Sequence, residues 1–181
     1  MKIFKYALLA STLIFASCSD DDDNTPDPVN EEEIITTMTI TLDSGSDQVE
    51  LQFQDLDGDG PDPATVTVSG PLNANTVYDG SIILLNETEM PAENITEEVE
   101  EEDDEHQFFY TVGSGLAAQT EYTNFDGDGN PLGTTFILTT GAASSGSLTF
   151  TLRHEPNKPN SGFEDAGGST DIEVSFDLVV E

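Results

Sequence analysis

The chain has 181 residues, of which 37 are Asp or Glu, four are Lys or Arg and two are His, so its formal net charge at pH 7 is −33. So negative a protein repels nucleic acid and anionic membrane surfaces, and it attracts cations and basic partners. The same acidity keeps an exposed protein soluble and monomeric, so we expect a monomer that does not bind nucleic acid.

Residues 1–17 predict a secretion signal. They contain two lysines, an apolar run over residues 6–15, and small residues directly before Cys18, the only cysteine. This order is typical of signal peptides, and the run is shorter than the roughly 20 residues that span a bilayer. Residues 14–18 (Ile-Phe-Ala-Ser-Cys) resemble the bacterial lipobox, with Phe15 where Leu is usual. We therefore predict a lipoprotein with fatty acids such as palmitate on Cys18; the alternative is a secreted protein with a stray thiol.

Residues 18–33 are predicted to be a lipidated, disordered tether. Removal of the signal would leave two basic residues against 37 acidic ones, a net charge of −35. The run Asp20-Asp21-Asp22-Asp23 is followed by a polar segment with two prolines, a composition too polar to form a core. The run is similar to the acidic export tags of surface lipoproteins, although a solvated spacer would have the same composition.

Residues 34–181 predict one all-β domain. Apolar and polar residues alternate in nine segments, which places one face of each strand in a core and the other in water. These segments cover residues 38–42, 49–53, 66–68, 77–85, 108–112, 119–124, 134–139, 148–152 and 172–180. The pattern, with turn residues between the segments, favours an antiparallel β-sandwich that is immunoglobulin-like in outline.

Residues 94–105 are predicted to form one short acidic helix. Asn94 is a suitable N-cap with Glu97 three residues later, and Ile95 and Val99 have helical spacing. Between Glu97 and Glu105 every residue except Val99 is acidic, which opposes a helix through like-charge repulsion. We therefore expect the helix to depend on packing of its two apolar residues.

The connections are predicted to separate by chemistry if successive strands alternate in direction. One end of the sandwich would then receive small, neutral turns. The other end would receive the loops at residues 55–63, 86–106, 124–131 and 155–170. All residues with metal-binding potential would lie at this second end.

Two loops carry aspartates at alternate positions before a glycine. They are Asp55, Asp57 and Asp59 in one loop and Asp126 and Asp128 in the other. Such spacing can supply oxygen ligands to Ca²⁺, although neither loop has the bidentate Glu or the flanking helices of an EF-hand. Asp-Gly pairs are also ordinary turn residues, and this alternative stays open.

The only histidines, His106 and His154, each neighbour a carboxylate, in Glu105-His106 and His154-Glu155. Two imidazoles with one or two carboxylates suit Zn²⁺ or a related ion. The spacing matches no known zinc motif, and a histidine at a strand end is often a hydrogen-bonded surface residue. We predict a shared Zn²⁺ site at His106, His154, Glu105 and Glu155, whereas Ca²⁺ is the ion that would suit the aspartate loops.

The sequence predicts no enzyme. It has no G-x-S-x-G elbow, no H-E-x-x-H, no phosphate-binding glycine loop and no tryptophan for stacking on sugars. The lipobox-like segment and the acidic run together resemble small surface-exposed outer-membrane lipoproteins of Gram-negative bacteria. That resemblance implies a lipid-anchored, cell-surface protein on the outer membrane. We expect an acidic binding lipoprotein that captures a divalent cation or cationic ligand for an outer-membrane transporter; a structural or adhesive sandwich is the alternative.

Overall fold

The computed structural model describes residues 33–58 and 60–181, which belong to one compact unit. Ten strands and two short helices follow one another along the chain. They are β1 (Thr37–Asp43), β2 (Gln48–Gln54), β3 (Thr65–Val68), β4 (Val77–Asn86), β5 (Glu93–Asn94), α1 (Ile95–Glu101), β6 (His106–Val112), β7 (Ala118–Tyr122), β8 (Thr135–Thr140), β9 (Ser144–His154), α2 (Phe163–Ala166) and β10 (Ser169–Val180). The nine expected strands are confirmed, and two elements are additional: the two-residue strand β5 and a second helix, α2, where one helix was expected.

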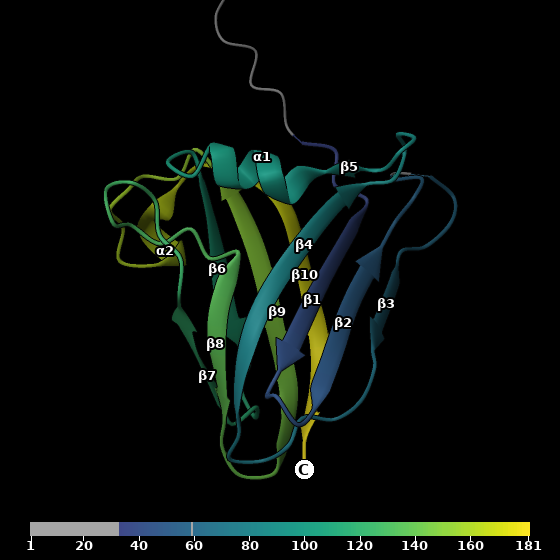
Figure 1. The fold of residues 1–181 in the computed structure, drawn as a ribbon, viewed down its shortest axis with the longest axis vertical. Helices are drawn as coiled ribbons and strands as arrows, with labels where there is room; N and C mark the ends of the chain where they lie inside the picture. Colours follow the sequence, from purple (N-terminus) through teal and green to yellow (C-terminus); the bar gives the residue numbers. More distant parts are fainter. Residues whose placement is uncertain (1–32, 59) are drawn as a thin grey trace, which may run out of the picture. The chain divides into compact units, whose positions relative to one another are not determined.

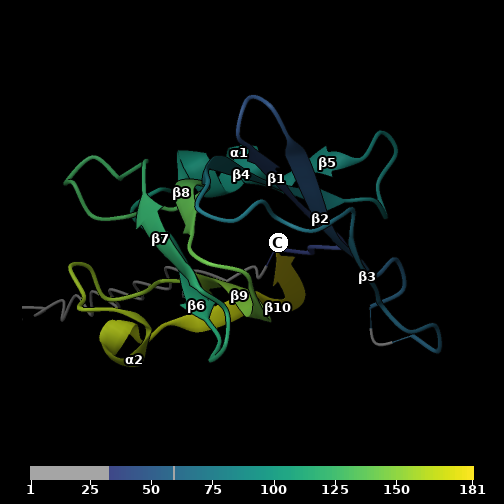
Figure 2. The ribbon, with the colours of Figure 1, turned by 90° about the horizontal axis from the view of Figure 1, so that it is seen from below.

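The strands form two antiparallel sheets that pack face to face, which confirms the all-β sandwich (Figures 1 and 2). The larger sheet has the order β3-β2-β1-β4-β8-β7, with β5 paired to β4. The smaller sheet has the order β10-β9-β6. Seven strands therefore face three, a more unequal division than the four and three of an immunoglobulin constant domain.

The core lies between the sheets and follows the predicted alternation. In β10 every second residue from Ile172 to Val180 is buried, and β4 shows the same pattern from Tyr78 to Asn86. Side chains such as Phe136, Phe150 and Phe176 fill the space between the layers, and each has at most 1% of its surface exposed. Burial of such large aromatic surfaces is the main force that holds the two sheets together.

The nine predicted strands alternate in direction along the chain, so the connections separate onto two ends as expected. Figure 1 shows α1, α2 and β5 at one end and the C-terminus at the other. The acidic loops and both helices share the first end. This sorting brings side chains together that are far apart in sequence.

Helix α1 confirms the prediction of a short helix, although it ends earlier than residue 105. Ile95 and Val99 are buried against the sandwich, as the predicted dependence on packing requires. The Asn94 side chain donates to the Glu97 carboxylate (2.9 Å) and makes no capping bond to the backbone. Within the described part of the chain, no helix combines the length and the apolar character needed to cross a membrane.

Candidate metal centre

Strand pairing brings the two histidines together. His106 is the first residue of β6, His154 is the last residue of β9, and the two are direct partners in the antiparallel register. Their ring centroids are 4.8 Å apart, and both residues are buried. The structure thus places the two imidazoles side by side, although 47 residues lie between them in sequence.

A β-bulge adds the first carboxylate. Thr170 pairs with Arg153 and Ile172 pairs with Leu152, so Asp171 is an extra residue on β10. Simple alternation from Ile172 would turn Asp171 outward, but a bulge redirects the side chain of its extra residue. The Asp171 side chain is fully buried and lies near both histidines.

The segment before β1 adds the second carboxylate. The Glu33 side chain is 4% exposed, and its Oε1 accepts a hydrogen bond from His106 Nε2 at 2.9 Å. Our sequence analysis placed Glu33 at the end of the tether, whereas the structure makes it part of the folded domain. The boundary between tether and domain thus lies at least one residue earlier than expected.

We call Glu33, His106, His154 and Asp171 the inner cluster. One ligand atom from each lies within 4.8 Å of the others. His154 Nδ1 is 3.8 Å from Glu33 Oε2 and 3.8 Å from Asp171 Oδ1, and His106 Nε2 is 4.0 Å from Asp171 Oδ2. Tetrahedral Zn²⁺ with bonds of about 2.0–2.2 Å holds its ligand atoms roughly 3.3–3.6 Å apart. Small side-chain movements would therefore complete such a site.

Two atoms of the inner cluster are buried without a hydrogen-bond partner. They are Glu33 Oε2 and His154 Nδ1, which face each other at 3.8 Å. A buried polar group left in this state costs about 1–3 kcal/mol, and more when it is charged. Folded proteins rarely tolerate that cost without a ligand, ion or water that completes the bonds.

Second-layer contacts orient both imidazoles toward the cluster. The Nδ1 of His106 lies 3.2 Å from the backbone carbonyl of Glu102, which follows α1, so Nδ1 keeps a proton when Nε2 gives up its own to bind a cation. The Nε2 of His154 lies 3.9 Å from Glu105 Oε2, so Nδ1 faces the cluster. Metal-ligating histidines usually donate their second ring N–H to a carbonyl or carboxylate, as the His106 contact allows, whereas the 3.9 Å contact of His154 is an ion pair without a hydrogen bond.

The charges of the inner cluster shift the pKa values of two members in opposite directions. Burial opposes the charge on Glu33, but the hydrogen bond from His106 and the nearby imidazoles outweigh it and lower its pKa. Burial likewise opposes protonation of His106, but the Glu33 carboxylate, the Glu102 carbonyl and Asp171 outweigh it and raise its pKa. In the metal-free cluster His106 is therefore more easily protonated, and this proton competes with a bound cation.

Glu105 and Glu155 lie on the outer side of His154. The three residues form a second group whose ligand atoms lie within 4.8 Å of one another, and both carboxylates are exposed. Half of the Glu105 side chain is accessible to solvent. The predicted grouping of both histidines with these two carboxylates is thus split, because His106 contacts Glu33 and Asp171 instead.

The first aspartate loop is not gathered with the histidines. Asp55 and Asp57 lie at the rim of a cleft, and Asp59 lies outside the described residues. Asp57 Oδ2 accepts the backbone N–H of Asp62 at 3.2 Å, which is ordinary turn bonding. Among the described residues, neither Asp55 nor Asp57 joins a group of three potential ligands.

The second aspartate loop is held by a lysine. Asp126 Oδ2 lies 3.3 Å from Lys158 Nζ, and both side chains are almost fully buried. Asp126 Oδ1 accepts the backbone N–H groups of Asp128 and Asn130 at 3.0 and 2.8 Å. Burial opposes the charge of Asp126, but bonds from Asn130 and Lys158 lower its pKa. A lysine thus occupies the place that we had predicted for a cation.

Sequence reasoning missed Glu33 and Asp171. Periodicity could not find Asp171, because a bulge reverses the inward and outward assignment of a single residue. Glu33 carried a weak signal, since it directly precedes Ile34-Ile35, the first apolar pair after the tether.

Cys18, the signal and the rest of the predicted tether lie outside the described residues. No family model matches the chain, and no curated protein or solved structure is significantly similar to it.

Proposed function

We propose that this domain is a divalent-cation-binding module whose inner cluster holds one Zn²⁺ or a closely related ion. Two imidazole nitrogens and two carboxylate oxygens form a donor set that suits this class of cation. The observation that carries the proposal is the pair of facing buried atoms, Glu33 Oε2 and His154 Nδ1, which have no hydrogen-bond partner. A cation between them would satisfy both.

Burial of the ligands supports a resident ion. The four side chains have between 0% and 7% of their surface exposed. Structural zinc sites are closed by four protein ligands, whereas catalytic sites keep a position open for water or substrate. This favours a metal that stabilises the domain, and it gives no support to an enzymatic role.

The ligands would also join the two sheets. Glu33 lies in the segment that leads into β1 of the larger sheet, whereas His106, His154 and Asp171 belong to the smaller sheet. A bound ion would therefore fasten the start of the domain to the opposite layer. We further infer that this start is connected to a lipid on Cys18, so that the module is anchored to the outer membrane and displayed at the cell surface.

The direct test of the metal site is calorimetric titration of the metal-free domain, residues 31–181, with Zn²⁺ and Ca²⁺. We expect one Zn²⁺ per chain and much weaker Ca²⁺ binding. The variants His106→Gln and His154→Gln should each remove Zn²⁺ binding. The double variant Asp55→Asn, Asp57→Asn is the matched control, because it removes two carboxylates from the same end and should leave the Zn²⁺ stoichiometry unchanged.

Two other results would redirect the proposal. Calcium binding that disappears in the Asp55, Asp57 double variant would move the site to that loop. No binding of either ion would leave a structural or adhesive sandwich as the remaining function.

A second function, delivery of the cation to an outer-membrane transporter, differs from the first in exchange rate. A resident ion dissociates slowly, whereas cargo must leave within the time of transport. Release of Zn²⁺ to an excess of chelator separates the two, and the buried cluster predicts slow release.

The anchor is tested separately by cell fractionation. We expect the full-length protein in the membrane fraction and the Cys18→Ala variant outside it. Replacement of Asp20 to Asp23 by alanine should reduce access of protease to the protein on intact cells. A Cys18→Ala protein that remains with the membranes would contradict lipid anchoring.

A further inference from the structure

The larger sheet extends beyond the cover of the smaller one. Leu51 of β2 is opposite Val68 of β3, and Phe53 is opposite Val66, so these four residues share the inner face of the sheet. Leu51 is fully buried, but Val66 is 47% exposed. Figure 2 shows the reason: the smaller layer ends at β10, whereas the larger layer continues through β2 to β3.

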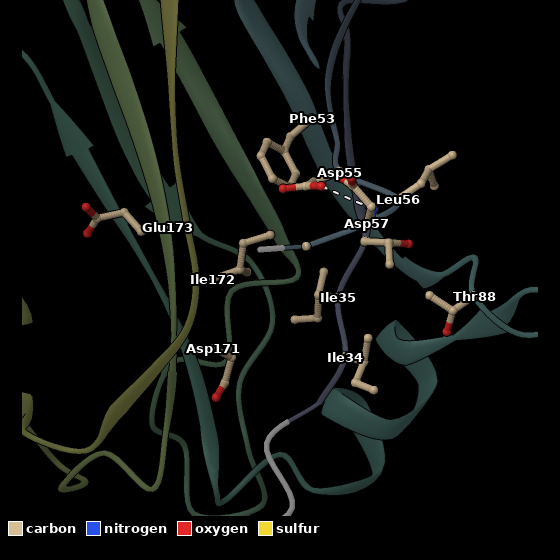
Figure 3. Close-up of a pocket in the computed structure, with 12 residues that line it drawn as sticks. Ile34, Ile35, Phe53, Asp55, Leu56, Asp57, Thr88, Asp171, Ile172 and Glu173 are labelled. Atoms are coloured by element: carbon tan, nitrogen blue, oxygen red, sulfur yellow. Dashed lines mark hydrogen bonds between the residues drawn. The ribbon is translucent and has the colours of Figure 1, made fainter. Parts of the chain in front are cut away.

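An open cleft of about 580 Å³ lies where the cover ends. Its apolar wall consists of Ile34, Ile35, Phe53, Leu56 and Ile172 (Figure 3). Ile34 and Leu56 are 61% and 56% exposed, which is unusual for large aliphatic side chains that line one concave surface. This volume lies within the range of ligand pockets and accommodates one or two large side chains.

The same cleft has acidic residues around the apolar wall. Asp55 and Asp57 lie together on one side of it (Figure 3). Glu173 also lines the cleft, but its carboxylate points away and accepts a hydrogen bond from Thr151 at 3.0 Å. None of the described residues that line the cleft is basic. The two basic residues of the domain are engaged elsewhere, since Arg153 bonds to Gly167 and Thr170 and Lys158 bonds to Asp126. The negative charge of the rim is therefore uncompensated.

We propose that this cleft binds a basic segment of another protein, which inserts an aliphatic or aromatic side chain against Ile34, Phe53 and Leu56 while its Lys or Arg residues contact the acidic rim. Charge complementarity selects this occupant. The chain's own residues 19–33 contain acidic residues and no Lys or Arg, so they lack the charge that would complement the cleft. The interaction goes beyond the proposed metal role and does not require it. The residues of the two sites are different except for Asp171, which belongs to both.

The test uses two synthetic peptides that differ only in apolar content. The first is acetyl-Lys-Lys-Leu-Phe-Lys-Lys-amide, and the second has Ser-Ser in place of Leu-Phe. Binding to residues 31–181 is followed by fluorescence anisotropy at physiological salt, with Zn²⁺ and with chelator. We expect the dissociation constant of the Leu-Phe peptide to be lower than that of the Ser-Ser peptide by about tenfold or more, because burial of one large apolar side chain is sufficient for that ratio.

Matched variants locate the binding. Ile34→Ser and Leu56→Ser should each weaken the Leu-Phe peptide about tenfold or more. Val77→Ser and Phe125→Ser are the controls, because Val77 and Phe125 are similarly exposed (56% and 50%) and lie outside the cleft. All four variants should keep wild-type Zn²⁺ stoichiometry and melting temperature, so loss of peptide binding is distinct from failure of the metal site.

Three results would overturn the proposal. Equal binding of both peptides would mean that attraction to the acidic protein is generic. Equal loss in the cleft variants and the controls would place the peptide elsewhere. No measurable binding of the Leu-Phe peptide would remove the site.

Discussion

Two groups of buried charged side chains lie at the same end of the sandwich, and they differ in how the protein satisfies them. Asp126 receives hydrogen bonds from two backbone N–H groups and the Asn130 side chain, together with the charge of Lys158. In the inner cluster, Glu33 Oε2 and His154 Nδ1 face each other without a hydrogen bond. The first group completes its own bonds, and the second is arranged for a ligand.

Buried charge alone therefore does not identify a binding site. Asp126 and Glu33 are both buried acids with lowered pKa values. The two groups differ in the number of atoms that the protein leaves without a hydrogen-bond partner and that a bound ion could therefore contact. We therefore expect changes at Asp126 to affect stability equally with and without metal, and changes in the inner cluster to alter the stabilisation that metal adds.

The largest expected effect follows from removal of Lys158. Lys158→Met should lower the free energy of unfolding by about 3–5 kcal/mol, because it leaves the buried Asp126 carboxylate without its cation. Denaturant unfolding measures this loss, which should be the same with Zn²⁺ and with chelator. The double variant Lys158→Met, Asp126→Asn should recover part of the loss. A smaller loss of unfolding free energy in Lys158→Met than in the double variant would show that the pair does not act as described.

The inner cluster should show the opposite behaviour. Zn²⁺ at about a hundred times its dissociation constant should raise the free energy of unfolding of the wild-type domain by about 2.7 kcal/mol. Glu33→Gln should abolish this gain, whereas Lys158→Met should retain it on a lower baseline. Thermal melts at constant ionic strength measure both; a Zn²⁺ gain that persists in Glu33→Gln would exclude Glu33 as a ligand.

A smaller effect is expected from the residue behind His154. Glu105→Gln should weaken Zn²⁺ binding by about tenfold at most, because the carboxylate 3.9 Å from the outer nitrogen of His154 is removed while the four ligands remain. Glu155→Gln is the matched control, since it removes an equal charge on the same side of His154. Equal effects of the two substitutions in calorimetry would mean that only the local charge matters.

The smallest effect is the pH dependence of the metal-free domain. The pKa of His106 is raised above 6.5, so its protonated form stabilises the fold fully below pH 6.5, and this contribution is lost as pH rises through the folded pKa. The pKa of Asp126 is lowered below 3.8, so its contribution is present above that pH and is lost as pH falls through the folded pKa. The free energy of unfolding, measured with chelator, should therefore fall as the pH rises above 6.5. His106→Gln should remove that fall.

Metal reverses this trend. Imidazole must lose its proton to bind Zn²⁺, so affinity should rise with pH over the range in which His106 titrates. A zinc-loaded domain that becomes less stable from pH 6.5 to 8 would contradict ligation by His106.

The fold could be predicted from the sequence almost completely, because its information is local. Alternation of apolar residues located nine strands, and the strict alternation of strand direction placed both histidines at one end. The two-residue strand β5 and the four-residue helix α2 left no periodic signal, since each is too short to show one.

The site could be predicted only by half. His106 and His154 were found because they are rare and lie at predicted strand ends. Glu33 and Asp171 were lost among 37 acidic residues, and their roles depend on features that no local pattern contains: the packing of the segment before β1 and the bulge in β10. In so acidic a chain, the informative property of a carboxylate is its burial, which only the structure provides.

The most direct test of the account is the zinc K-edge X-ray absorption spectrum of the domain after loading with one equivalent of Zn²⁺ and desalting. We predict a four-coordinate ion with two imidazole nitrogens and two carboxylate oxygens at about 2.0–2.2 Å. His106→Gln and His154→Gln should each retain no zinc through the same procedure. A wild-type domain that loses its zinc on desalting, or a spectrum that shows only oxygen ligands without imidazole scattering, would contradict the central claim.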